Sequence, residues 1–265
     1  MRAVGLDLAA TLDSLDQMAS QRPVAAQIVA TSNEENAGAA ELAAMLGADV
    51  ALAAKVMKLA NSAYFGLSGK VTSLPFAVTV VGFNTVRSIA TVALAGIDGA
   101  KALPDGFWDT SVHLAAACGT LGPQFGTTTA DALCLGLLAP LGSALLHQAD
   151  TDGYDDLVAS TDLGPQRFEA ERQRYGLSSP QLTAVALEHW RFSAAMVTVL
   201  REVPNGPEGA LVRTAYELTG RLVAPGRPRT PLAGLSLNRV TESQAPARLA
   251  VIRADVAALR TALGL

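Results

Sequence analysis

One run of residues governs the architecture: Val56-Met57-Lys58-Leu59-Ala60-Asn61-Ser62-Ala63-Tyr64-Phe65-Gly66-Leu67. Its apolar part has helical spacing and stops at Asn61-Ser62, two residues whose side chains can bond free backbone groups at a helix end. Two adjacent aromatic residues and a glycine follow at once. No other part of this alanine- and leucine-rich chain is so dense in specific side chains.

The composition limits the fold and the class of partner. Of the 265 residues, 50% are hydrophobic, 17% are charged and 5% are aromatic. The chain is therefore too apolar to be disordered, and its abundant alanine and leucine favour helix over sheet. A formal net charge of -4 gives no general attraction to nucleic acid or anionic lipid, so we expect neither as a partner.

The cysteines and the apolar runs indicate in which cellular compartment the protein is expected. Cys118 and Cys134 lie in apolar helical runs and are expected to be buried free thiols, since no disulfide framework or zinc spacing is present. No secretory signal is visible at the N-terminus. The longest weakly polar run, residues 132–146, contains Pro140 and is interpreted as a buried helix pair or a kinked helix, not a membrane span. We expect a cytoplasmic protein.

Apolar periodicity and capping residues predict an all-α N-terminal part. Asp49, Ser73 and Asn84 are expected to be N-caps, and Gly47 a C-cap. A polar break is expected at residues 32–36. The predicted helices cover residues 6–20, 23–31, 37–46, 50–60, 74–81 and 85–97.

A loop with glycines and a proline, residues 98–106, is the expected joint of the chain. It separates an N-terminal helical subdomain, residues 1–105, from a C-terminal helical bundle, residues 106–265. Neither part shows a sustained period of two or a clear repeat, so the predicted class is all-α throughout. The bundle helices are expected over residues 107–121, 131–147, 150–160, 165–175, 180–190, 193–203, 207–223 and 245–263.

Signatures of common catalytic sites are missing from the sequence. It contains no phosphate-binding loop and no nucleophile elbow. The histidines, His113, His147 and His189, are far apart, and each is interpreted as a partly buried or capping residue and not as a metal ligand.

The run from Leu59 to Gly66 closely resembles the central motif of HDOD domains, which are bacterial regulatory relatives of the HD phosphohydrolases. Further similarities follow in order over about residues 6–200. Phe107-Trp108 with Ser111 resembles the "FW.HS" start of the HD-like half, and residues 136–142 resemble its "GLLHDIG" helix. The resemblance implies an HD-domain, phosphodiesterase-like helical bundle preceded by a helical subdomain.

Departures from the family pattern affect the expected chemistry. Thr110 and Ser179 stand where family members often carry histidines, and Ala139-Pro140 replaces the metal-binding His-Asp pair of HD enzymes. Alanine and proline offer no side-chain ligand, and without a metal no water is activated for attack on phosphate. The resemblance therefore implies a non-enzymatic regulatory module without metal or cofactor. It would act in signal transduction by binding a protein or a small ligand.

Two compatible interpretations of the central motif remain. Asn61, Ser62, Tyr64, Phe65 and Gly66 are candidates for a binding or signalling interface. In the simpler interpretation, which we favour, the two polar residues bond backbone groups at the helix end and the two aromatic residues pack the joint between the halves.

Other functions are kept as alternatives. One is a nucleotide-sensing protein, for instance for a cyclic dinucleotide. Another is a divergent metal-dependent phosphohydrolase that uses Asp109, Asp131, His147 and Asp150. A DNA-bound regulator is disfavoured by the acidic balance. The expected partner is another signalling protein, and self-association would suit a helical module of this apolarity.

Overall fold

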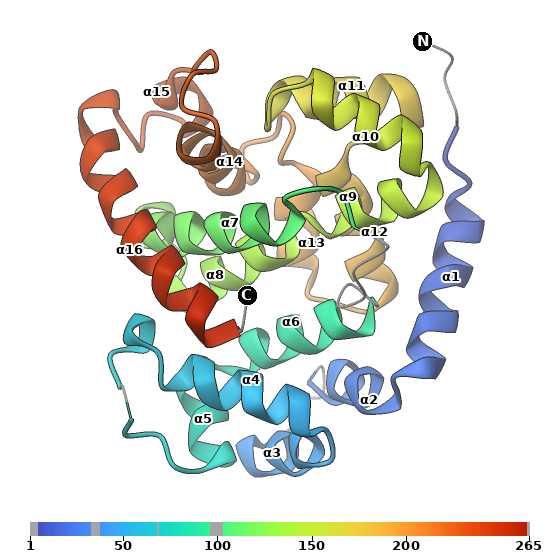
Figure 1. Cartoon of the computed structure of the whole chain (residues 1–265), viewed down its shortest axis with the longest axis vertical. Helices are drawn as coiled ribbons and strands as arrows, with labels where there is room; N and C mark the ends of the chain where they lie inside the picture. The colour runs from blue at the N-terminus through green and yellow to red at the C-terminus, as the bar shows by residue number, and fades with distance from the viewer. Residues whose placement is uncertain (1–4, 33–37, 68, 96–102, 264–265) are drawn as a thin grey trace.

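The computed structural model describes residues 5–32, 38–67, 69–95 and 103–263, and all regular elements in these ranges are helical (Figure 1). The predicted all-α class is confirmed. Large parts of the polar break at 32–36 and of the joint at 98–106 lie outside the described residues.

The helices of the N-terminal part follow the predicted order. Asp49 caps its helix as expected, since its Oδ1 accepts bonds of 3.0 Å from the backbone N–H groups of Ala51 and Leu52. Ser73 accepts a longer bond from the N–H of Phe76, at 3.4 Å. The elements are α1 (Leu8–Gln21), α2 (Pro23–Thr31), α3 (Ala39–Gly47), α4 (Val50–Ala60), the 3-10 turn η1 (Ala63–Phe65), α5 (Leu74–Val81) and α6 (Phe83–Leu94).

Two predicted caps are wrong. Gly47 is the last residue of α3, and the cap is Ala48 with right-handed backbone angles. Asn84 lies inside α6, because Gly82, with φ of 83°, already turns the chain between α5 and α6. The Asn84 amide donates instead to Asp131 Oδ1 at 2.8 Å.

In the C-terminal part the long apolar run is a pair of helices that break at Ala139-Pro140. Taken together as Thr129–Ala149, they form a stretch long and apolar enough to cross a bilayer, with a mean hydropathy of 1.6, but 78% of it is buried. Burial in the core accounts for this hydropathy. The elements are α7 (Phe107–Leu121), η2 (Gly122–Phe125), α8 (Thr129–Leu138), α9 (Leu141–Ala149), α10 (Thr151–Ser160), α11 (Pro165–Tyr175), α12 (Ser179–His189), α13 (Ala194–Arg201), α14 (Ala210–Val223), α15 (Leu232–Leu235), η3 (Glu242–Gln244) and α16 (Ala245–Leu263).

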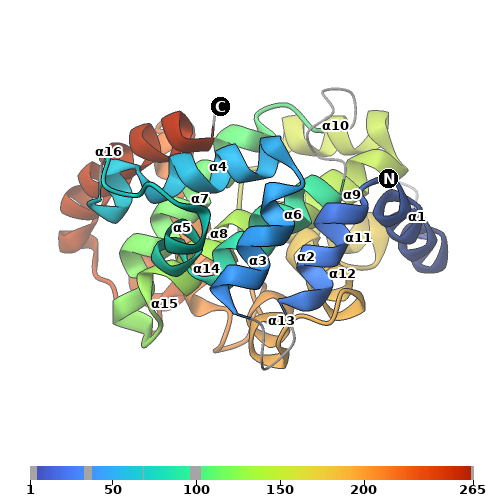
Figure 2. The same ribbon diagram turned by 90° about the horizontal axis from the view of Figure 1, so that it is seen from below.

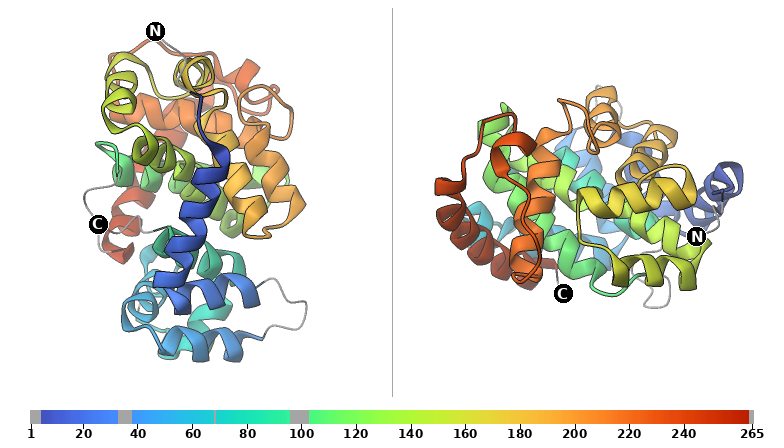
Figure 3. Two further views of the ribbon diagram at one scale, coloured as in Figure 1. Left: turned by 90° about the vertical axis from the view of Figure 1, so that its right-hand side faces the viewer. Right: turned by 90° about the horizontal axis from the view of Figure 1, so that it is seen from above.

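The helices form two lobes around a shared core. Helices α2 to α5 make the lower lobe in Figure 1, and α6 leads from it to α7 and α8 at the centre of the upper one (Figures 1 and 2). On one side α16 packs on α7 and also reaches α4 and η1. On the other side α1 runs along both lobes (Figure 3). One continuous apolar cluster includes residues on both sides of position 105, among them the buried free thiols of Cys118 and Cys134.

Two glycines set the distance between central helices. A Cβ atom on Gly136 would lie 2.3 Å from the carbonyl oxygen of Leu114 in α7, and one on Gly142 would lie 1.9 Å from the carbonyl oxygen of Ser179 in α12. Because real Cβ atoms do not approach backbone so closely, α8 and α9 pack at these distances only with glycine there.

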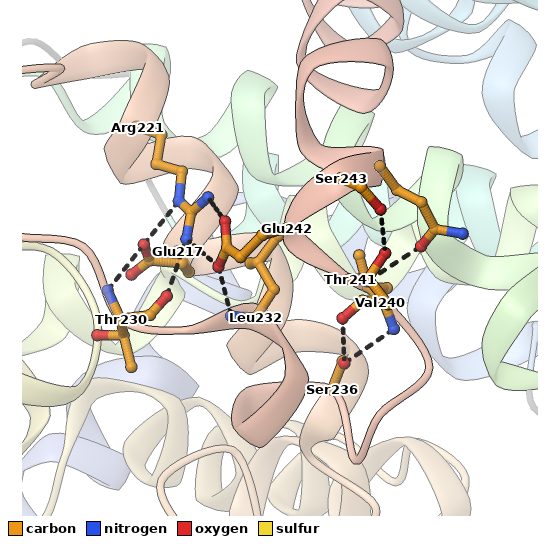
Figure 4. A network of polar contacts seen from close by, with 10 residues as sticks. Glu217, Arg221, Thr230, Leu232, Ser236, Val240, Thr241, Glu242 and Ser243 are labelled. Carbon is orange, nitrogen blue, oxygen red and sulfur yellow. Dashed lines mark hydrogen bonds and ion pairs between the residues drawn. The ribbon is translucent and has the colours of Figure 1, made fainter.

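A network of hydrogen bonds and ion pairs holds the segment that follows α14 against this helix (Figure 4). The Arg221 guanidinium donates to Glu217 Oε1 at 2.8 Å, to Glu242 Oε2 at 2.7 Å and to the Thr230 carbonyl at 2.8 Å. Glu242 Oε1 also accepts the N–H of Leu232 at 2.9 Å. One buried guanidinium therefore holds the segment from Thr230 to Glu242 against α14.

This network predicts a pH dependence of stability. Hydrogen bonds from Arg221 lower the pKa of Glu242 from 4.5 to about 2. A lowered pKa in the folded state means that the stabilisation is complete above pH 4.5 and is lost as the pH falls toward 2. The Glu242 side chain is 55% exposed, so solvent screens the pair and we expect a contribution of about 1 kcal/mol at most.

Thermal unfolding of the wild type and of Glu242→Gln, followed by circular dichroism from pH 7 to pH 2, measures this contribution. The wild type should be the more stable protein near neutrality, and the two curves should converge in acid. A difference that stays constant over the whole range would show that Glu242 does not titrate as proposed.

Candidate functional site

Asn61 closes the loop that follows α4. Its Nδ2 donates to the carbonyls of Met57, at 3.2 Å, and Val71, at 2.8 Å, and its Oδ1 accepts the N–H of Val71 at 3.0 Å. One amide side chain therefore satisfies both backbone groups of Val71, which is only 3% exposed. The loop between Asn61 and Val71 is tied together at its base.

Other residues of the motif shape the turn itself. Ser62 Oγ donates to the Leu59 carbonyl at 2.7 Å, at the end of α4. Gly66 has φ of 69° and ends η1, a backbone conformation that strongly favours glycine. The local geometry of the motif thus follows from these short-range bonds.

Tyr64 connects the turn to the other lobe. Its ring meets that of Phe65 edge to face, with centroids 5.2 Å apart. Its hydroxyl lies against α7, where a Cβ on Gly119 would be 2.1 Å away. Burial, with smaller effects from Asp255 and Cys118, raises the pKa of Tyr64. The buried hydroxyl has no hydrogen-bond partner among the described residues.

The motif therefore lies at the joint between the lobes. Asn61 and Ser62 bond to backbone, Gly66 makes the turn, and Tyr64 reaches α7 while η1 contacts α16. These contacts are what the simpler interpretation expects. A role of the five residues as a binding surface stays a prediction.

Three positions that depart from the HD pattern come together in space. Thr110 of α7, Pro140 at the break before α9, and Ser179 at the start of α12 line one cavity of about 30 Å³. We call it the inner pocket. Its volume has room for only one or two waters.

Aromatic side chains form much of the wall of the inner pocket. Tyr154, Phe168 and Tyr216 line it and are each at most 2% exposed, and the last two meet edge to face at 4.9 Å. Behind them the buried carboxylate of Glu171 accepts the Tyr154 hydroxyl at 2.7 Å and the Ser179 N–H at 2.6 Å. Burial raises the pKa of Glu171. Apolar aromatic rings and the bonded carboxylate of Glu171 therefore make up this side of the inner pocket.

The alternative metal ligands do not converge. In the described part of the chain, no three His, Cys, Asp or Glu side chains are arranged to hold a metal ion. This corrects the ligand set proposed for a divergent hydrolase. Each member has its own neighbour: Asp109 pairs with Arg260, Asp131 bonds Asn84, His147 contacts Asp155 at 3.2 Å, and Asp150 pairs with Arg174 at 2.8 Å.

An outer cleft of about 260 Å³ opens beside the inner pocket and shares Thr110 and Arg167 with it. Arginines line it, but several are already engaged. Arg227 pairs with Asp162 at 2.5 Å, and Arg221 is held in the network described above. Arg167 donates to backbone carbonyls of its own lobe. Two of the four arginines that line the outer cleft, Arg221 and Arg227, are therefore paired with carboxylates.

The family model of the HDOD domain matches residues 18–205, well over half of the sequence. The chain belongs to the HDOD family. The resemblance found in the sequence is thereby confirmed. No curated protein matches this HDOD chain.

Solved structures share the fold of this HDOD chain. An HDOD domain protein of unknown function from Geobacter sulfurreducens has 17% identity and a TM-score of 0.68, and the match covers 98% of this chain and 100% of that one. A candidate phosphohydrolase from Shewanella amazonensis SB2B has 20% identity and a TM-score of 0.68, covering 94% and 98%. A candidate signal transduction protein from Marinobacter aquaeolei VT8 has 20% identity and a TM-score of 0.64, covering 99% and 66%.

Sequence reasoning missed what surrounds the inner pocket of this HDOD domain. Tyr154, Phe168 and Tyr216 come from α10, α11 and α14, far apart in the chain. In the sequence each is one aromatic residue of an amphipathic helix, indistinguishable from an ordinary core position. The sequence indicated a changed pocket only through the departures from the family pattern at Thr110, Pro140 and Ser179.

Proposed function

We propose that this HDOD protein is a non-catalytic regulatory module that acts in signal transduction by binding another protein or a small ligand. The inner pocket carries the non-catalytic part of the proposal: Thr110, Pro140 and Ser179 line it together with buried aromatic side chains. A structurally similar chain from Marinobacter aquaeolei VT8 is described as a signal transduction protein, which supports a regulatory role.

The chemistry of these residues supports a non-catalytic role. Metal-assisted hydrolysis of a phosphodiester needs ligands that leave a coordination position open for an activated water. Alanine and proline at positions 139 and 140 provide no such ligand. The small volume of the inner pocket, about 30 Å³ with Tyr154 and Phe168 in its wall, also supports a non-catalytic role.

Metal content and turnover test this proposal together. Purified protein is incubated with Mn²⁺, desalted and analysed for bound metal, then assayed with bis(p-nitrophenyl) phosphate. We expect substoichiometric metal and no hydrolysis above the buffer rate. Stoichiometric metal with turnover that is lost in His147→Ala or Asp150→Ala would establish a divergent hydrolase instead.

Nucleotide sensing is the second candidate function, because Arg167 and Arg229, which form no ion pair with a described residue, line the outer cleft. A thermal-shift screen with mononucleotides and cyclic dinucleotides tests it. A rise in Tm that disappears in Arg229→Ala would support nucleotide binding in the outer cleft. A flat response to all nucleotides would count against nucleotide sensing.

A further inference from the structure

A separate apolar groove of about 430 Å³ shares no residue with the inner pocket or the outer cleft. Leu135 of α8, Met196 of α13 and Leu211 of α14 contribute to it and are buried. Leu237 and Arg239, from the loop after α15, also line it. Its size falls in the range of sites that hold ligands. We call it the α13 groove.

Hydrogen bonds within the loop after α15 fix its conformation at the edge of the α13 groove. Ser236 Oγ accepts the N–H of Val240 at 2.9 Å and donates to the carbonyl of Val240 at 3.2 Å, which closes the loop at its base (Figure 4). The N–H of Asn238 bonds the Ala233 carbonyl at 2.7 Å. Residues 237–239 form the tip and are all exposed.

Leucine is an unexpected residue at this tip. Leu237 and Asn238 have φ of 54° and 64°, in the left-handed region that disfavours residues with a Cβ atom, bulky ones especially, and favours glycine or asparagine. Leu237 is 46% exposed, so a large part of its side chain faces solvent and not the core. Neither backbone preference nor core packing explains this leucine. Strain of this kind is typical of sites whose side chains make contacts with another molecule.

Two of the three charged residues that line the α13 groove are acidic. Asp131 lines it, and its carboxylate is bonded to two neutral donors, Asn84 Nδ2 at 2.8 Å and Thr128 Oγ1 at 2.7 Å. Glu208 also lines it, and its N–H bonds the carboxylate of Glu202 at 3.0 Å. Arg239, the cation in the lining, lies over the Phe125 ring at 5.1 Å. Charge complementarity therefore favours a basic occupant.

We propose that the α13 groove binds an amphipathic helix of a partner protein, with aliphatic side chains in the groove and a lysine or arginine beside Asp131 and Glu208. A helix suits the site better than a small molecule, because the apolar surface continues from buried Leu135 and Met196 onto exposed Leu237. The inference rests on the proposed regulatory function and names the class of partner.

Two synthetic helical peptides of equal length test the proposal by fluorescence anisotropy. One has a leucine face flanked by lysines, and the other has the same face flanked by glutamates. The wild-type protein should bind the lysine peptide at least about tenfold more tightly than the glutamate peptide. Leu237→Asp should weaken binding of the lysine peptide about tenfold, although its new carboxylate would strengthen any general attraction to lysine.

Two further variants separate groove binding from charge and from folding. Val251→Asp adds the same charge at a residue of α16 that is 48% exposed and outside the groove, and it should bind like the wild type. Leu237→Gly relieves the backbone strain, so its Tm should equal or exceed that of the wild type while its affinity for the lysine peptide falls.

Several results would overturn the proposal. They include equal affinity of the wild type and Leu237→Asp, and no binding of either peptide. A dimer seen by sedimentation in the wild type and lost in Leu237→Asp would show a second copy of this chain as the occupant. Binding of octanoate without peptide binding would show a small apolar ligand. None of these outcomes changes the metal and turnover assay, so the regulatory proposal stands or falls separately.

Discussion

Replacing Gly142 with alanine should destabilise the protein by about 3 kcal/mol or more, the largest effect we expect from a single methyl group. The new Cβ would lie 1.9 Å from the Ser179 carbonyl oxygen and 2.9 Å from the backbone nitrogen of Thr183. Both obstacles are backbone of α12, so no side chain can rotate away. Helix α9 must move, which also strains the 2.8 Å bond from the Gly142 N–H to Thr183 Oγ1.

Gly47→Ala is the matched control. Gly47 is the last residue of α3, its φ is not positive, and a Cβ there meets no atom within 4 Å. Alanine should stabilise this position by about 0.5 kcal/mol. Urea unfolding of the two variants and the wild type measures both effects. If Gly142→Ala and Gly47→Ala unfolded at the same urea concentration, close helix contact at Gly142 would not be a feature of the protein.

Asn61→Ala should cost about 2–3 kcal/mol, the second-largest effect. The variant loses the bonds of Asn61 to both backbone groups of Val71 and leaves that N–H and carbonyl buried without partners. An unsatisfied buried polar group costs more than a hydrogen bond between exposed groups gains. The turn that carries Tyr64 to α7 should loosen as a result.

Ser62→Ala serves as the comparison for Asn61→Ala. It removes one bond, to the Leu59 carbonyl at a helix end, and should cost about 1 kcal/mol or less. Chemical denaturation measures both variants, and a pull-down from native cells compares their partners. If Asn61→Ala folded with wild-type stability but lost a specific partner, the motif would be an interface and not a structural clasp.

Local signals account for what the sequence predicted of the helices. Asp49 and Ser73 act on N–H groups two or three residues away, so their caps could be read directly. Asn84 has the same chemistry but lies inside α6, because the turn at Gly82 and the bond to Asp131 outweigh its capping preference. That bond joins residues far apart in the sequence, and no local rule includes it.

The candidate sites also differ in whether their features follow from short-range signals or from contacts between residues far apart in the sequence. The resemblance to HDOD domains selected Thr110, Pro140 and Ser179, and the structure brings these three to one pocket. The resemblance gave no indication of the aromatic walls of this pocket, because they depend on the packing of three helices that are far apart in the sequence. The α13 groove was equally hidden. The exposure and backbone angles of Leu237 are properties of the folded loop, not of the residue.

The contacts of helix α16 determine when the joint between the lobes can fold. It contacts α4 and η1, which precede it by most of the chain, as well as α7. During translation, α4 and the turn with Tyr64 leave the ribosome long before the helix that covers them. Their apolar contact surface therefore stays open to chaperones until α16 emerges. A slow codon run or a stalled ribosome before α16 would prolong that exposure, so the joint is completed only after α7 to α15 have been synthesised.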